Sequence, residues 1–167
     1  DIKRVDAKLG NEKFVANAPE EIVEEEKEKR EAAVARKAKI LEALERLTSR
    51  FYDAILSEPD PMLEPLFRGM DPNHPKYVAA WLAETFGGPQ TYTEGRGGYE
   101  HMLAKHRNRG ITEEQRQHWI RRMTEIADEV GLPADPGFRS TFVAYLEWGT
   151  RLAVVNSRPG AAVMEHA

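Results

Sequence analysis

Histidines are the residues of this sequence best suited to bind a metal, and five of them occur in 167 residues. Cysteine is absent, which excludes disulfides, iron–sulfur clusters, thiolate-bound zinc and cofactors attached through Cys-x-x-Cys-His. The sequence also lacks a His-Glu-x-x-His zinc motif, a Gly-x-Ser-x-Gly elbow and a phosphate-binding loop. The glycine-rich residues 95–98 follow a predicted helix rather than a strand, which argues against a dinucleotide site. Metal chemistry must therefore rest on His, Asp, Glu or Tyr.

The histidines occur among many aromatic residues, spread over several predicted helices: Phe51, Tyr52, Phe67, His74, Trp81, Phe86, His106, Trp119 and Met123. Trp119, Met123 and Ile126 are spaced to share one helical face. Such a set can enclose a flat apolar ligand. An ordinary apolar core gives the same spacing, and the spacing alone favours that interpretation.

The elements that must position these residues are all predicted to be helices. We expect a first helix ending at Gly10, a turn over residues 11–19, and a long helix from Pro19 to about Leu56. Gly87-Gly88-Pro89 is expected to end a helix, and residues 95–98 are expected to be loosely structured. Thr112 and Gln115 are spaced to form a capping box at the start of another helix. Further helices are predicted at residues 75–86, 99–106, 112–130 and 136–157. No segment alternates apolar and polar residues, so the fold class is all-α.

The composition changes near residue 48. Residues 1–47 carry 11 Lys and Arg residues, 12 Asp and Glu residues and one aromatic residue, Phe14. A long charged helix with a sparse apolar stripe is typical of a helical hairpin or coiled coil. We therefore predict a charged helical extension at 1–47, a main domain at 48–160 and a flexible tail at 161–167.

The overall charge gives no general reason to expect nucleic acid or an anionic membrane as a partner, because the formal net charge is −4. No apolar run is long enough to span a bilayer, and no signal peptide is evident. These features, together with the absence of cysteine, predict a cytoplasmic protein.

A series of motifs between residues 50 and 157 carries a more specific signal. In chain order they are Arg50-Phe51-Tyr52, Leu63-x-Pro65-Leu66-Phe67, Gly87-Gly88-Pro89-x-x-Tyr92-x-Glu94, Met102-x-x-x-His106, His118-Trp119-x-x-x-Met123, Tyr145-x-Glu147 and Ala153-x-x-Asn156-Ser157. In this order and spacing they resemble the group II truncated haemoglobins. The resemblance implies a truncated two-over-two globin fold that binds haem b, iron protoporphyrin IX.

The same resemblance implies a role for each site residue. His106 matches the proximal histidine that binds iron, and His101 lies on another face of the same helix. Tyr52, His74 and Trp119 would be distal donors to the bound ligand, and His74 could instead bind iron itself. Contacts to the cofactor are expected from His106, Phe67, Val78, Trp81, Tyr92, Arg96, Lys105, Trp119 and Met123. Among these, Tyr92, Arg96 and Lys105 are candidates for the haem propionates.

The function implied by the resemblance is reversible binding of oxygen or another diatomic gas, with release slowed by the three distal donors. A haem redox enzyme, a nitric oxide dioxygenase or a peroxidase served by an unidentified reductase, is the alternative. Rates of autoxidation and of reaction with nitric oxide would distinguish the two. The sequence does not determine the oligomeric state.

Residues 1–47 resemble a different family, the C-terminal coiled-coil arm of valyl-tRNA synthetase. The match lies in Lys8-Leu9, in the run from Asn11 to Glu21 and in the Glu/Lys-rich helix that follows. In that family the arm helps to hold tRNA, which would make this segment an RNA- or partner-binding module. The balanced charge is not the basic face that phosphate binding needs. It favours a solvated extension or fusion remnant, with nucleic acid not expected as a partner.

Overall fold

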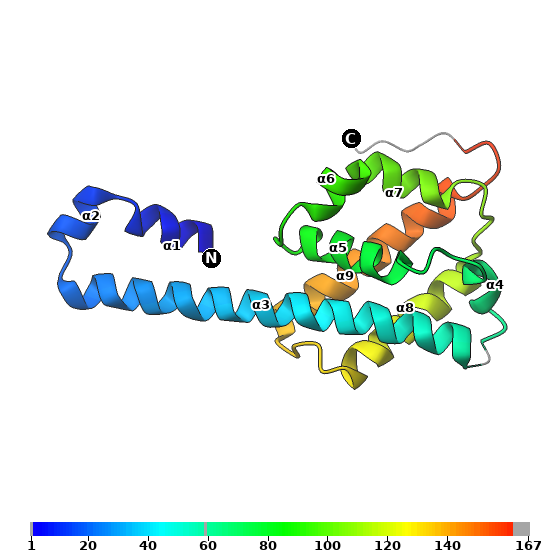
Figure 1. Ribbon diagram of the computed structural model, residues 1–167, viewed down its shortest axis with the longest axis horizontal. Helices are drawn as coiled ribbons and strands as arrows, with labels where there is room; N and C mark the ends of the chain where they lie inside the picture. Colours follow the sequence, from blue (N-terminus) through cyan, green and yellow to red (C-terminus); the bar gives the residue numbers. More distant parts are fainter. Residues whose placement is uncertain (1, 59, 162–167) are drawn as a thin grey trace. The chain divides into compact units, whose positions relative to one another are not determined.

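The computed structural model describes residues 2–58 and 60–161. Its helices, shown in Figure 1, are α1 (Ile2–Leu9), α2 (Glu12–Asn17), α3 (Glu20–Ser57), α4 (Glu64–Phe67), α5 (His74–Thr85), α6 (Thr91–Arg96), α7 (Gly98–His106), α8 (Glu113–Glu129) and α9 (Pro136–Asn156). The described residues contain no strand, which confirms the all-α class. None of the helices in these ranges combines the length and apolar character needed to cross a membrane. The tail predicted at 161–167 lies, except for Ala161, outside the described residues.

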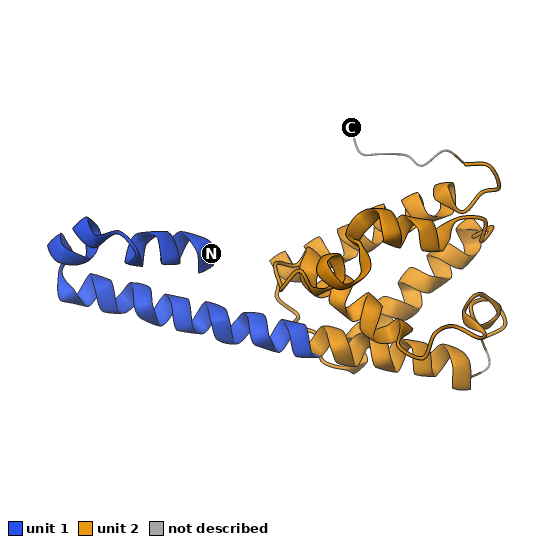
Figure 2. Ribbon diagram, turned by 45° about the horizontal axis from the view of Figure 1, so that its top comes forward, with its two compact units in different colours: residues 1–42 blue, residues 43–167 orange. Residues whose placement is uncertain are grey.

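The chain divides into two compact units, residues 1–42 and residues 43–167 (Figure 2). The first unit is a helical hairpin in which α1 packs against the first part of α3. Val5 and Val23 are buried in this hairpin, and Lys8 Nζ lies 3.0 Å from Glu26 Oε1. The predicted N-terminal helical extension is confirmed.

The turn predicted over residues 11–19 is wrong, because most of this segment forms α2. The Asn11 side-chain oxygen accepts hydrogen bonds from the backbone N–H groups of Lys13 and Phe14, at 3.1 and 3.3 Å. Asn11 is therefore a helix N-cap, a role that its residue type favours and that the prediction of a turn overlooked.

The loosely structured segment predicted at residues 95–98 is also wrong. Helix α6 continues to Arg96, and α7 begins at Gly98. Gly97 between them has a φ of 89°, a left-handed conformation that glycine adopts readily. The glycines thus make one sharp turn between two helices. The short helix α4 was not predicted.

Unit 2 is built in two layers, which confirms the two-over-two arrangement. The second part of α3 buries Leu44, Leu47, Phe51 and Ile55, which share one face. Helices α8 and α9 pack together in the other layer. The Phe51 ring contacts the Trp119 ring of α8 edge-on, with centroids 5.3 Å apart.

Helices α8 and α9 are joined by Arg116, which is only 3% exposed. Its guanidinium donates to Glu113, on the same helix, and to Glu147 of α9, each at 2.6 Å. The predicted capping box of Thr112 and Gln115 begins α8 and is confirmed. Arg116 therefore connects the start of α8 to the middle of α9.

We expect Arg116→Ala to lower the free energy of unfolding by about 1.5–3 kcal/mol, because it removes charge-assisted hydrogen bonds made by a buried group. Urea denaturation measures the change. Arg151→Ala is the matched control: Arg151 Nε also bonds Glu147, at 3.1 Å, but its side chain is exposed. That variant should cost less than about 1 kcal/mol, and equal costs for the two variants would contradict the assigned role of Arg116.

Candidate functional site

His106 is the last residue of α7, and its ring is held in one orientation. Its Nδ1 lies 2.9 Å from the Met102 carbonyl oxygen, and since a carbonyl only accepts, Nδ1 carries the proton. Burial lowers the pKa of His106, and the charge of Arg109 lowers it further against the opposing effect of the Met102 hydrogen bond. His106 is therefore a neutral imidazole with Nε2 left as an acceptor, which is the form that binds a metal ion.

A second cluster forms where the start of α5 meets α3. His74 Nε2 lies 3.2 Å from the Tyr52 hydroxyl oxygen, and the two rings meet edge-on with centroids 4.8 Å apart. The Phe67 ring lies 5.1 Å from the Tyr52 ring. Tyr52 is buried, and burial raises the pKa of its hydroxyl far above the ordinary value. The hydroxyl therefore stays protonated and can donate.

Burial lowers the pKa of His74, and a protonated His106 would lower it further. Helices α5 and α7 meet in one region of unit 2, where the Trp81 and Tyr99 rings stack with centroids 6.2 Å apart. The end of α7 offers the His106 imidazole nitrogen, and the start of α5 with α3 offers the Tyr52 hydroxyl and a second imidazole.

These shifts predict how stability depends on pH. In the unfolded chain both histidines titrate near about pH 6.5, whereas the lowered pKa values keep them neutral in the folded chain. Just below that pH the unfolded state binds more protons, so the free energy of unfolding should fall as the pH drops from about 7.5 to 5.5. Urea denaturation of the ligand-free protein at several pH values tests this. His74→Leu should reduce the slope, and an unchanged slope would count against the lowered pKa of His74.

The predicted residues of α8 lie in the core beside this region. Trp119 is half-buried against Phe51, the neighbour of Tyr52 on α3, and Met123 is completely buried. The ring contact places Trp119 next to the Tyr52 cluster.

Arg96 has unused hydrogen-bonding capacity. Its guanidinium carbon lies 3.5 Å above the centre of the Tyr77 ring, and Nη2 is 3.5 Å from His101 Nε2. Its Nε is buried and has no partner among the described residues. A buried donor without a partner is unusual, and a carboxylate bound at this position would satisfy it.

The other residues predicted to contact the cofactor differ in how deeply they are buried. Trp81 Nε1 donates to the Tyr145 hydroxyl at 2.7 Å, and the Trp81 ring lies 5.2 Å from the buried Tyr92 ring. Val78 is half-buried and Lys105 is exposed. The hydrogen bond between Trp81 and Tyr145 was not predicted, because the two residues are 64 positions apart and no local signal pairs them.

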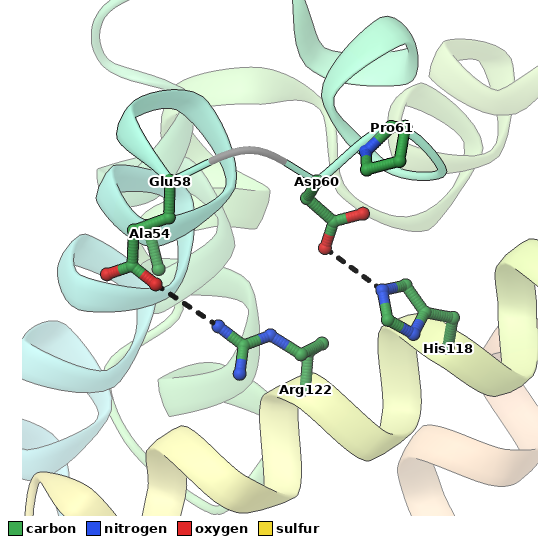
Figure 3. Close-up of a pocket in the computed structure, with 6 residues that line it drawn as sticks. All are labelled: Ala54, Glu58, Asp60, Pro61, His118 and Arg122. Carbon is green, nitrogen blue, oxygen red and sulfur yellow. Dashed lines mark hydrogen bonds and ion pairs between the residues drawn. The ribbon is translucent and has the colours of Figure 1, made fainter.

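Sequence reasoning also missed a cavity of about 270 Å³ at the end of α3, drawn in Figure 3. His118 Nε2 lies 3.0 Å from Asp60 Oδ2, and Arg122 Nη2 lies 3.7 Å from Glu58 Oε2. Every charged side chain that lines this cavity is paired within it, which is typical of a structural contact. Within the described ranges no three His, Asp or Glu side chains gather as a metal site.

Comparison with known proteins assigns the two parts of the chain separately. The family model described as bacterial-like globin matches residues 40–144. A group 2 truncated hemoglobin of Bacillus subtilis is 31% identical over 94 residues, which cover 56% of this chain and 69% of that protein. No solved structure matches the chain.

The N-terminal part matches the family described as the valyl tRNA synthetase tRNA binding arm, over residues 1–48. Valine–tRNA ligases of Bradyrhizobium diazoefficiens and Rhodopseudomonas palustris are 81% and 83% identical to this chain over 47 residues. Those residues cover 28% of this chain but only 5% of each ligase.

Proposed function

Because the chain belongs to the bacterial-like globin family, we propose that unit 2 binds haem b and that His106 is the residue that would bind its iron. The observation that carries this proposal is the hydrogen bond from His106 Nδ1 to the Met102 carbonyl. It fixes the tautomer and leaves Nε2 available, which is how a metal-bound histidine is normally oriented. The lowered pKa of His106 supports the proposal, because only the neutral ring can bind iron.

The neighbouring side chains have the chemistry that a porphyrin needs. Phe67, Val78 and Trp81 offer apolar surface for the ring. Arg96 offers a buried N–H without a partner, which suits a propionate. Tyr92 and Lys105 are the further propionate candidates, and Lys105 is exposed as a residue at the rim of such a site would be.

We propose reversible binding of a diatomic gas such as oxygen as the function of this site. The haem iron supplies the open coordination position for the gas. Tyr52 holds its proton because burial raises the pKa of its hydroxyl, so it can donate a hydrogen bond to the ligand. His74 and Trp119 are the other donors proposed for this side. We also propose 48–160 as the limits of the globin domain, and a cytoplasmic location.

Absorption spectroscopy of the full chain titrated with haem tests the proposal. We expect saturation at about one haem per chain with a strong Soret band, and a ferrous form that binds carbon monoxide. A six-coordinate ferrous spectrum that becomes five-coordinate in His74→Leu would identify His74 as a second ligand. If the native chain takes up no stoichiometric haem, the proposal is wrong.

Contact with tRNA is a second candidate function, favoured by the match of residues 1–48 to a tRNA-binding arm. Four of the cations in this hairpin are already paired: Lys8 with Glu26, Lys27 with Glu24, Lys29 with Glu25 and Arg30 with Asp6. We therefore expect weak binding that is lost between about 50 and 200 mM salt. A gel shift of tRNA should disappear when residues 1–47 are deleted, and a shift that survives the deletion would exclude this segment as the contact.

A further inference from the structure

A second cavity, of about 370 Å³, lies in unit 2 where the ends of α7 and α9 meet. The two ends are joined by hydrogen bonds to Ser157: its carbonyl accepts from Gly110 N at 3.0 Å, and its hydroxyl accepts from Ile111 N at 2.9 Å. The volume falls in the range of small-molecule sites, about 300–1,000 Å³. The residues that line it are Arg107, Asn108, Asn156, Arg158, Gly160 and Ala161.

The wall of this cavity contains a polar group that nothing in the described chain satisfies. Asn156 is 3% exposed, and neither its side-chain nitrogen nor its side-chain oxygen has a hydrogen-bonding partner among the described residues. Buried polar groups in folded proteins are nearly always paired with protein, water or ligand. Because Asn156 is one of the residues that line the cavity, a polar molecule bound there would supply the missing partner of its amide.

The charge around the cavity is positive. Arg107 and Arg158 are exposed and form no ion pair with a described residue, and none of the described residues that line the cavity carries a carboxylate. The nearby Arg109 adds to this field, since its charge lowers the pKa of both His74 and His106. The cavity in Figure 3 differs, because its His118 and Arg122 side chains face Asp60 and Glu58.

Arginines near helix C-termini also interact favourably with the helix dipole. That interaction explains the presence of cations at the ends of α7 and α9. The interaction with the helix dipole explains neither the unpaired Asn156 amide nor the cavity between the two helix ends. The unpaired amide and the two unpaired guanidinium groups share one explanation if an anion with several acceptor oxygens lies between them.

We propose that this cavity is a binding site for a phosphate group. Guanidinium groups bind phosphate through paired N–H donors, so Arg107 and Arg158 would hold the anion from two sides. The Asn156 amide would donate to a third oxygen. Asn108 follows Arg107 directly and has a left-handed backbone conformation, with a φ of 58°. Arg107 and Asn108 both line the cavity. The phosphate belongs either to inorganic phosphate or to a small phosphate monoester.

Isothermal titration calorimetry of the full chain tests the site at constant ionic strength in a phosphate-free buffer. Inorganic phosphate and glycerol 3-phosphate are titrated in separate experiments. We expect one saturable site per chain with a Kd below about 1 mM for at least one of them. Tighter binding of the ester identifies a phosphate monoester as the ligand, whereas equal binding identifies phosphate alone as the determinant.

Three variants decide whether the binding occurs at this cavity. Arg107→Gln and Arg158→Gln should each weaken binding about tenfold or more, since each removes charge-assisted hydrogen bonds. Arg151→Gln removes an exposed arginine of α9 that is not among the residues lining the cavity. This variant should leave the Kd within about twofold. Asn156→Leu should weaken binding but raise the melting temperature of the ligand-free protein, because it removes an unsatisfied buried amide.

The absence of saturable binding up to about 10 mM of either compound would overturn the proposal. Binding that is equally tight in Arg107→Gln and Arg158→Gln would also overturn it, because the anion would then lie elsewhere. Neither result depends on haem, so the proposal stands or fails independently of the proposed gas binding.

Discussion

We expect His106→Gly to lower the affinity for haem by more than about 100-fold. Loss of a residue that only hydrogen-bonds a metal ligand already lowers metal affinity by about 10–100-fold, and this variant removes the ligand itself. The variant removes the imidazole whose Nε2 is left available by the 2.9 Å contact between Nδ1 and the Met102 carbonyl. The other histidine of α7, His101, lies on another face of the helix, where its ring is 6.4 Å from that of Tyr92. Absorbance titration with haem, and the rate of haem transfer to an excess of apomyoglobin, measure the loss.

Two controls separate loss of the ligand from loss of the fold. Free imidazole should restore the Soret spectrum of His106→Gly by occupying the space that the side chain leaves. His101→Ala changes a half-buried histidine of the same helix whose ring lies 6.4 Å from that of Tyr92, and it should retain haem. An unchanged spectrum in His106→Gly, or an equal loss in His101→Ala, would contradict the assignment of the axial ligand.

Tyr52→Phe should accelerate oxygen release by roughly 10–150-fold, which corresponds to about 1.5–3 kcal/mol for a hydrogen bond to a partly charged acceptor. Tyr52 is 2% exposed, so its donor acts in a region with little competing water. Stopped-flow measurement of the oxygen dissociation rate tests this. Tyr145→Phe is the matched control: its hydroxyl accepts from Trp81 at 2.7 Å, so the variant should lose stability but change oxygen release by less than about twofold.

A double-mutant cycle with His74→Leu tests whether the two distal side chains act together. Because His74 Nε2 lies 3.2 Å from the Tyr52 hydroxyl oxygen, removal of one changes the orientation of the other. We expect the combined effect on the oxygen release rate to differ from the sum by about 0.5 kcal/mol or more. Strict additivity would show that the two side chains act independently, and no acceleration in Tyr52→Phe would show that the hydroxyl does not reach the ligand.

Features that depend on neighbouring residues could be predicted from the amino-acid sequence. The bounds of α5, α7, α8 and α9 agree with the predicted ranges to within one residue, because helix starts and stops are encoded by local capping, proline and glycine. The capping box of Thr112 and Gln115 is one such case. The motifs from Arg50 to Ser157 were sufficient to indicate the globin family, and residue spacing alone could not have separated that family from an ordinary helical core.

Contacts between side chains of distant segments could not be predicted and follow from the packing of the helices. Trp81 with Tyr145, His118 with Asp60 and Arg116 with Glu147 are separated by 64, 58 and 31 positions. Helix periodicity places each residue on a face but does not fix which helix that face contacts. The unpartnered Asn156 amide likewise follows only from how the ends of α7 and α9 come together, since an asparagine at a helix end is ordinary in sequence. Packing of whole helices sets these distances, and no local propensity encodes them.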